Sequence, residues 1–166
     1  STAKGSVSGW EAGGLVGGNI GAIDQSYSTG AVTGTFAGGL VGVNADDPDV
    51  GTITNSYSTG NAGLGGFIDY YEGGDIESSY STGSVTTGGG GFACGIDGPV
   101  SSDYWDTTTS GTDYGGCSDE NVSGITGLTT QQLQSGLPEG FDPTMWAENP
   151  KINNGLPYLI GNPPNK

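Results

Sequence analysis

The pentapeptide SYSTG occupies residues 26–30, 56–60 and 79–83. It lies within a longer unit that begins with a glycine pair, as in GGLVGGNIGAIDQSYSTGAVTG from Gly13. Such glycine pairs recur about every 25 residues, starting at residues 13, 38, 65 and 90. A unit this short cannot bury its own apolar residues, so successive units must stack on one another.

The apolar residues of each unit form short groups separated by glycine, such as Leu15-Val16 and Ile20, and nothing recurs at helical spacing. Short strands with glycine corners predict an all-β fold, a parallel β-solenoid with one unit per coil. We expect about four to five coils over residues 1–111. Equivalent residues then lie above one another at ~4.8 Å, and a repeated pentapeptide preserves that register.

Alternation along Ser-Tyr-Ser directs each tyrosine to one side of the strand and both serines to the other. We expect the tyrosines to form one column that points inward or is partly buried, because serine is better suited to water; an outer aromatic strip is the alternative. This column consists of Tyr27, Tyr57, Tyr80 and Tyr104. The glycines that end the pentapeptides are predicted to form corners with positive φ. They are Gly30, Gly60 and Gly83.

The chain has 166 residues and a formal net charge of -15, with three lysines and no arginine or histidine. Such a protein repels polyanions and anionic membranes, so nucleic acid is excluded as a partner. No apolar run is long enough for a membrane span, and we predict no membrane insertion. The start at Ser1, without a leader, indicates a processed or excerpted segment.

Cys94 and Cys117 are the two cysteines, and neither belongs to a CxxC pair. Without histidine a zinc site would need further carboxylate ligands, so a disulfide is favoured, with free buried thiols as the alternative. A disulfide would indicate an oxidising, extracellular environment.

Two groups of acidic residues are candidate sites. The insertion ADDPDV places Asp46, Asp47 and Asp49 on one loop, where they are a candidate Ca²⁺ site or a solvated charged bulge. Asp103 and Asp106 resemble the carboxylate pair of a glycosidase. We interpret them as turn residues, and a lyase would need a cation that the chain lacks. The sequence therefore predicts no enzyme and no cofactor other than this candidate Ca²⁺.

Residues 112–166 are predicted to form an irregular C-terminal cap. In LTTQQLQSGLP, Thr129 and Gln132 have the spacing of a capping box, so we expect a short helix over about 130–135. Apolar residues beyond it are expected to cover the last coil. They are Phe141, Met145, Trp146, Ile152, Leu156, Tyr158 and Leu159.

The pattern GGLVGxNxGxIxxSYSTGxV resembles the GLUG repeat of large secreted and surface-anchored bacterial proteins, over residues 5 to about 111. The third copy departs from it, with GGFIDYYEGG, and the fourth has SDYWDTTTSG in place of SYSTG. The resemblance implies a right-handed β-helix-like module on an extracellular or cell-surface protein, serving as a stalk or an adhesive region. It implies no catalytic residue.

Two functions are consistent with these observations. One is structural: a stalk module of a longer surface protein, or a filament subunit that self-associates head to tail through its uncapped N-terminal coil. The alternative is an adhesin that binds a glycan. A lesser possibility is an ice-binding face formed by a threonine ladder, Thr29, Thr59 and Thr82.

Overall fold

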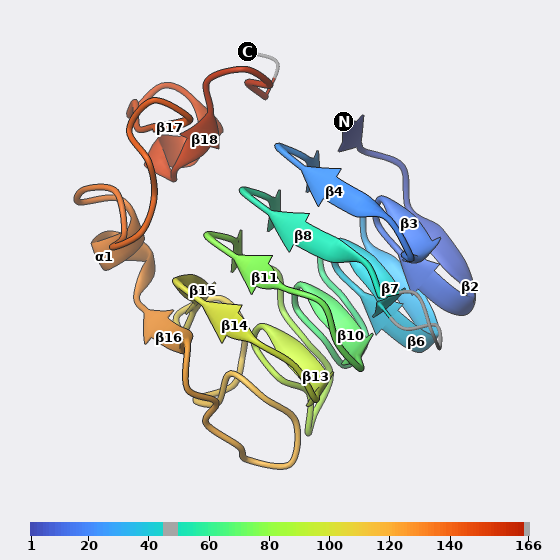
Figure 1. Ribbon diagram of the computed structural model, residues 1–166. Helices are drawn as coiled ribbons and strands as arrows, with labels where there is room; N and C mark the ends of the chain where they lie inside the picture. The colour runs from blue at the N-terminus through green and yellow to red at the C-terminus, as the bar shows by residue number, and fades with distance from the viewer. Residues whose placement is uncertain (45–49, 165–166) are drawn as a thin grey trace.

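The computed structural model describes residues 1–44 and 50–164. Its strands stack in parallel and in register into a β-solenoid of about five turns (Figure 1). The predicted all-β class is therefore confirmed. Within the described residues, helical structure is limited to α1 (Thr130–Leu133) and a 3-10 turn at Asn153–Gly155.

Each turn contributes short strands to stacked sheets. The six-stranded sheet contains β1 (Thr2–Ala3), β5 (Tyr27–Ser28), β9 (Tyr57–Ser58), β12 (Tyr80–Ser81), β15 (Asp103–Asp106) and β16 (Ile125–Leu128). One four-stranded sheet contains β3 (Val16–Gly18), β7 (Val41–Asn44), β10 (Ile68–Tyr71) and β13 (Ala93–Ile96). The other contains β4 (Ala22–Asp24), β8 (Thr52–Thr54), β11 (Ile76–Glu77) and β14 (Val100–Ser101). The strands β2 (Val7–Gly13) and β6 (Val32–Gly38) form a separate parallel pair, and β17 (Trp146–Ala147) and β18 (Tyr158–Leu159) form an antiparallel pair.

The register superposes like residues. Tyr27 is paired with Tyr57, and Ile23 with Ile53. Inside the coil, apolar side chains from neighbouring turns contact each other, and the rings of Phe67 and Phe92 stack at 4.7 Å. Burial of such apolar surface is the main favourable contribution to folding.

The serines of the pentapeptide point into the coil. Ser28, Ser58 and Ser81 are fully buried, and their hydroxyls donate to the carbonyl oxygens of the glycine-pair residues on the opposite wall, at 2.6 to 2.7 Å. A Cβ on Gly39 would lie 2.8 Å from Ser58 Oγ, so this wall leaves room only for a small side chain. The expectation that the serines face water is therefore wrong. The tyrosines are buried, as expected, but they do not point into the coil.

The tyrosines instead form a file on the outside of the coil, hereafter the tyrosine file (Tyr27, Tyr57, Tyr80 and Tyr104). The first three rings are nearly parallel, with centroid separations of 4.8 and 5.0 Å. The file is buried because the C-terminal segment covers it with Leu133, Phe141, Trp146, Leu156 and Leu159.

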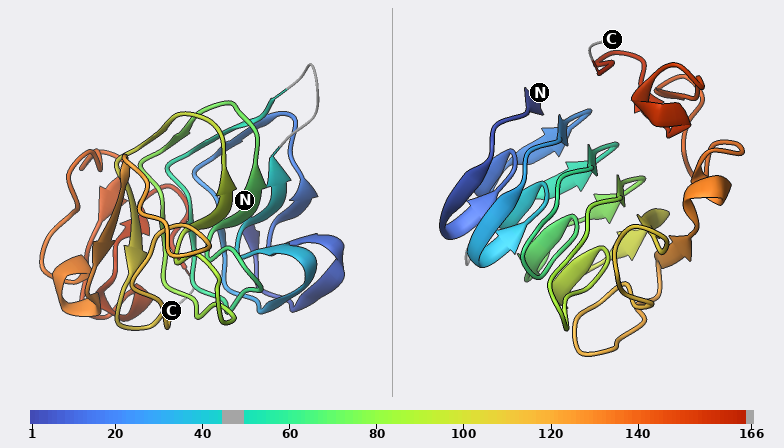
Figure 2. Two further views of the ribbon diagram at one scale, coloured as in Figure 1. Left: turned by 90° about the horizontal axis from the view of Figure 1, so that it is seen from below. Right: turned by 180° about the vertical axis from the view of Figure 1, so that it is seen from behind.

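The C-terminal segment thus runs along the side of the solenoid, and not over its last coil as the sequence analysis expected. It extends back to the first turn, where Asn162 Nδ2 donates to the carbonyl oxygen of Ser1 at 2.9 Å (Figures 1 and 2). Packing on the tyrosine file buries the apolar side chains of this segment together with the tyrosine rings, which stabilises the docked arrangement.

At the last coil, Trp105 takes the inward position that serine has in earlier turns. A Cβ on Gly91 would overlap its indole ring, so Trp105 fills the interior here. The ladder continues beyond residue 111, where the solenoid was predicted to end, because β16 pairs with β15. Cys94 and Cys117 form a disulfide that ties the loop before β16 to β13.

The pentapeptide glycines lie where neighbouring coils approach each other closely. Gly30, Gly60 and Gly83 do not have the positive φ that was predicted. Their Cβ atoms would overlap a glycine carbonyl of the preceding coil. The left-handed corners lie two residues before each tyrosine, at Gln25, Asn55, Ser78 and Ser102, with φ of 45 to 54°.

The predicted capping box is present. The Thr129 side chain accepts from the backbone N–H of Gln132, and the Gln132 side chain accepts from the N–H of Thr129. The helix ends at Leu133, two residues earlier than expected. Within the described ranges, no helix is long and apolar enough to cross a membrane.

Candidate functional site

The second repeat unit is shorter than the first between its pentapeptide glycine and the glycine pair that follows. Gly60 is followed by NAGL before Gly65, whereas Gly30 is followed by AVTGTFA before Gly38. The third turn consequently has no counterpart of β2 and β6, and among the described strands β6 pairs with β2 alone. Residues 61–63 follow the edge of β6 without forming a strand, through Val32 N–H to Asn61 O and Gly63 N–H to Ala37 O.

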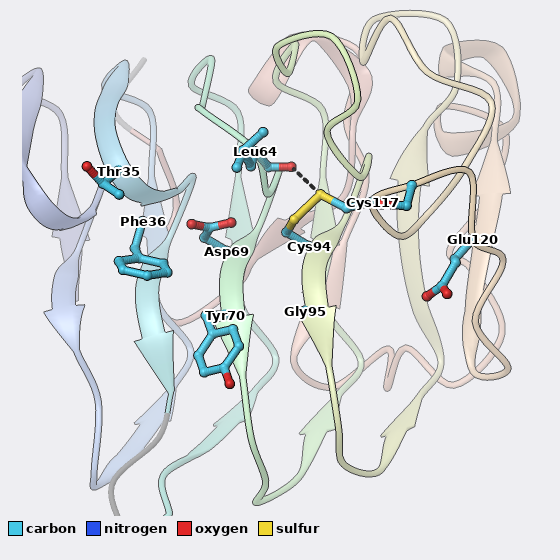
Figure 3. A pocket seen from close by; sticks show the side chains of 10 residues that line it. Thr35, Phe36, Leu64, Asp69, Tyr70, Cys94, Gly95, Cys117 and Glu120 are labelled. Atoms are coloured by element: carbon cyan, nitrogen blue, oxygen red, sulfur yellow. Dashed lines mark hydrogen bonds between the residues drawn. A yellow bond between two sulfur atoms is a disulfide. The ribbon is translucent and has the colours of Figure 1, made fainter.

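This difference creates a hollow of about 360 Å³ on the outer surface. Residues from several turns line it, as Figure 3 shows: Thr35, Phe36, Leu64, Asp69, Tyr70, Cys94, Gly95, Cys117, Ser118 and Glu120. The disulfide therefore forms part of its wall.

Three aromatic side chains lie along this face, hereafter the aromatic row (Trp10, Phe36 and Tyr70). The ring centroids of Trp10 and Phe36 are 6.0 Å apart, and those of Phe36 and Tyr70 are 6.2 Å apart. Trp10 is 69% exposed and Tyr70 is 38% exposed. An exposed row of large aromatic side chains marks an interaction surface.

Asp69 lies in the wall of the hollow. It takes the strand position that Gly42 has one turn earlier, and it is only 2% exposed. Its Oδ2 accepts from the backbone N–H of Ala37 in β6 at 3.0 Å. Burial raises the pKa of its carboxyl to about 6. No hydrogen bond from residues 1–44 or 50–164 reaches Oδ1, and Figure 3 shows the carboxylate pointing from β10 toward Phe36.

Further carboxylates surround the aromatic row. Tyr70 Oη donates to Glu72 Oε1 at 2.5 Å, and this bond, with the charges of Glu72 and Asp97, raises the pKa of Tyr70. Glu11 is paired in register with Phe36, and the exposed Glu120 lines the hollow. Neither described lysine is among the lining residues. The face thus combines aromatic rings with negative charge.

The acidic residues singled out in the sequence lie elsewhere. Asp46, Asp47 and Asp49 fall outside the described residues. Among the described ones, no group of three or more Asp, Glu, Cys or His is placed to hold a metal ion. Asp103 Oδ1 accepts from the N–H of Ser79, and Asp106 accepts from the N–H groups of the turn that follows it. Both carboxylates are buried within the fold.

The threonine ladder is not uniformly open. Thr29 is exposed, whereas Thr59 and Thr82 are half-buried beside the C-terminal segment. A groove lined by both also contains Asn153 and Leu156 of that segment. Such a surface is not the flat, open face that ice binding would require.

The parallel coils, stacked in register, define the chain as a β-solenoid repeat protein. The GLUG motif family matches residues 37–63, which contain most of the second repeat unit. The matched motif and the stacked coils together support a GLUG-repeat β-solenoid protein. Comparison with curated proteins and with solved structures finds no match. The GLUG repeat and the disulfide are consistent with an extracellular protein.

The aromatic row and Asp69 were not predicted from the sequence. A signal was available, because GGFIDYYEGG departs from the repeat at the residues that line the hollow. Replacement of a stacked glycine by Asp69 indicates a place where the packing of the coil changes. The contribution of Trp10 and Phe36 follows only from the folded arrangement of β2 and β6.

Proposed function

We propose that the chain is an adhesive module of a secreted or surface-anchored repeat protein, and that it binds polysaccharide on the aromatic row. The exposed row beside a hollow with a buried carboxylate carries this proposal. Aromatic rings supply apolar faces against which the C–H groups of a sugar ring pack. A few fixed polar groups then select orientation, as in other ligand sites.

The solenoid suits this role physically. The ladder between β2 and β6 fixes Trp10 relative to Phe36, and the hydrogen bond from Ala37 N–H to Asp69 connects β6 to β10, which carries Tyr70. A prearranged surface loses less conformational entropy on binding than a flexible loop does. The row is also longer than one sugar ring, which favours a chain over a monosaccharide.

The test is a glycan array followed by calorimetric titration with the oligosaccharides it retains. Trp10→Ala is expected to weaken binding at least about tenfold, the loss typical of a central aromatic contact. Ile160→Ala is the matched control, since Ile160 is an exposed apolar residue of the C-terminal segment. Retention of no glycan, or equal affinities for both variants, would reject the proposal.

A second candidate function is head-to-tail self-association, as part of a stalk or filament. Within residues 1–44 and 50–164, the strands β1, β2, β3 and β4 each pair on one side only. A row of free strand edges in the register of the coil beneath is a template for strand addition. Electron microscopy and sedimentation over a range of concentrations test this. Long unbranched assemblies support it, and monomers at every concentration contradict it.

A further inference from the structure

The aromatic row and the hollow are surrounded by negative charge. Five carboxylates lie on or beside this face: Glu11, Asp69, Glu72, Asp97 and Glu120. The described lysines, Lys4 and Lys151, are not among the lining residues, and the chain has no arginine or histidine. A formal net charge of -15 reinforces the local negative potential.

We propose that this site binds a polysaccharide of amino sugars whose amines are free and protonated. The inference rests on the proposed glycan-binding function and deepens it by specifying the charge of the ligand. Anionic polysaccharides are repelled by the same carboxylates. Neutral polysaccharides can pack on the rings but leave the carboxylates without a charged partner.

Asp69 is the residue that makes the site more than a charged surface. Its carboxylate is almost fully buried, and Ala37 N–H engages only one of its oxygens among the described groups. The other oxygen, Oδ1, is not among the fully buried side-chain atoms that lack a partner, so from the wall of the hollow it can accept from a donor or pair with a positive charge. An ammonium group in the hollow supplies both, and a charge-assisted hydrogen bond is stronger than a neutral one.

The aromatic rings favour the same ligand. A cation above the face of tryptophan or tyrosine is attracted by the electron density of the ring. Trp10 and Tyr70 are the exposed members of the row, and Tyr70 is bonded to Glu72. A sugar ring with an ammonium substituent therefore finds an apolar face and a negative partner together.

The experiment compares three hexasaccharides of the same β-1,4 linkage by calorimetric titration with the full chain. One consists of glucosamine, one of N-acetylglucosamine and one of glucose. The glucosamine hexamer is expected to bind about tenfold to a hundredfold more tightly than the other two, as one charge-assisted contact predicts. Asp69→Asn is expected to remove that advantage and to change the affinity for the neutral hexamers by less than about twofold.

Asp113→Asn is the matched control, because it removes one exposed carboxylate that does not line the hollow. It is expected to retain the preference for glucosamine, whereas loss of the preference in both variants would indicate non-specific charge attraction and overturn the inference. Binding of the neutral hexamers as tight as that of the glucosamine hexamer would also overturn the inference. The proposed polysaccharide-binding function would survive that result if Trp10→Ala abolished binding of the neutral hexamers. Failure of all three hexamers, with no glycan retained on the array, rejects the proposed function itself. Circular dichroism and melting temperature establish that each variant is folded.

Discussion

The tyrosine file contains a natural comparison between two hydroxyl groups in nearly the same apolar environment. Tyr57 and Tyr80 are stacked neighbours, both fully buried, with ring centroids 5.0 Å apart. Their hydroxyls differ. Tyr80 Oη donates to the carbonyl oxygen of Pro157 at 2.6 Å and accepts from Asn153 at 2.8 Å. Tyr57 Oη is buried, and no described residue bonds to it.

Replacement of each tyrosine by phenylalanine removes only the hydroxyl and keeps the ring. Tyr80→Phe is expected to lower the free energy of unfolding by about 1 to 2 kcal/mol, because two hydrogen bonds are lost. The cost is moderated because Asn153 also donates to Pro157 O. Tyr57→Phe removes a buried hydroxyl without a partner, whose desolvation costs about 1 to 3 kcal/mol. It is expected to leave the free energy of unfolding unchanged or to raise it.

Urea denaturation measures both variants, with an unchanged slope showing that the same surface is exposed on unfolding. For a chain of this size, each kcal/mol shifts the melting temperature by about 2 to 4 °C. Tyr104→Phe is a third reference, since its hydroxyl bonds to Glu139 O at 2.8 Å at the partly open end of the file. Equal destabilisation by Tyr57→Phe and Tyr80→Phe would refute the reasoning, because it would mean that Tyr57 Oη has a partner or that the C-terminal segment does not cover the file.

Three further predictions concern buried carboxylates and the disulfide. Burial raises the pKa of the Asp69 carboxyl to about 6, from an ordinary value of 3.8. The protonated carboxyl therefore stabilises the fold fully below pH 3.8, and this stabilisation is lost as the pH rises through about 6. Asp69→Asn should be more stable than the wild type above that pH, and the difference should disappear in acid. Melting temperatures from acid to neutral pH test this. Asp103 occupies the position that serine has in the earlier turns, and burial raises the pKa of its carboxyl well above the usual range. Asp103→Ser should raise the denaturation midpoint at neutral pH, because the serine hydroxyl can accept from Ser79 N–H as serines do elsewhere in the ladder. A lower midpoint would show that the longer aspartate side chain is needed for this bond. Replacement of Cys94 and Cys117 by alanine should cost roughly 3 kcal/mol in urea denaturation, the value for a loop of this length, and an unchanged midpoint would contradict it.

The fold was predictable because the repeat encodes register directly. Identical pentapeptides can stack only if Tyr27, Tyr57 and Tyr80 superpose, and a period of about 25 residues is too short for a unit that folds alone. The capping box at Thr129 was equally local, since two side chains three residues apart satisfy each other's backbone groups.

The direction of the tyrosines was not predictable in the same way. Alternation separates Tyr57 from Ser58 but does not say which of them lies inside the coil. Two distant facts decide it: glycine pairs on the opposite wall leave space only for serine, and the segment after residue 129 buries the tyrosines from outside. Burial of an outer face by a segment far along the chain is a tertiary effect that no local pattern specifies.

The candidate site arises where the repeat is broken. In the first two turns, β2 and β6 cover the outer surface of the coil, and a Cβ on Gly42 would lie 3.0 Å from Ala12 N. Shortening of the second unit leaves no further strand of this kind beside β6, so Asp69 can replace glycine and accept from the Ala37 N–H of β6. The regular units therefore form a rigid frame, and the irregular unit places a carboxylate and a hollow on the outer surface of that frame. In a protein made of stacked repeats, we expect binding sites where a unit departs from the repeat, lacks an outer strand and buries a charged side chain.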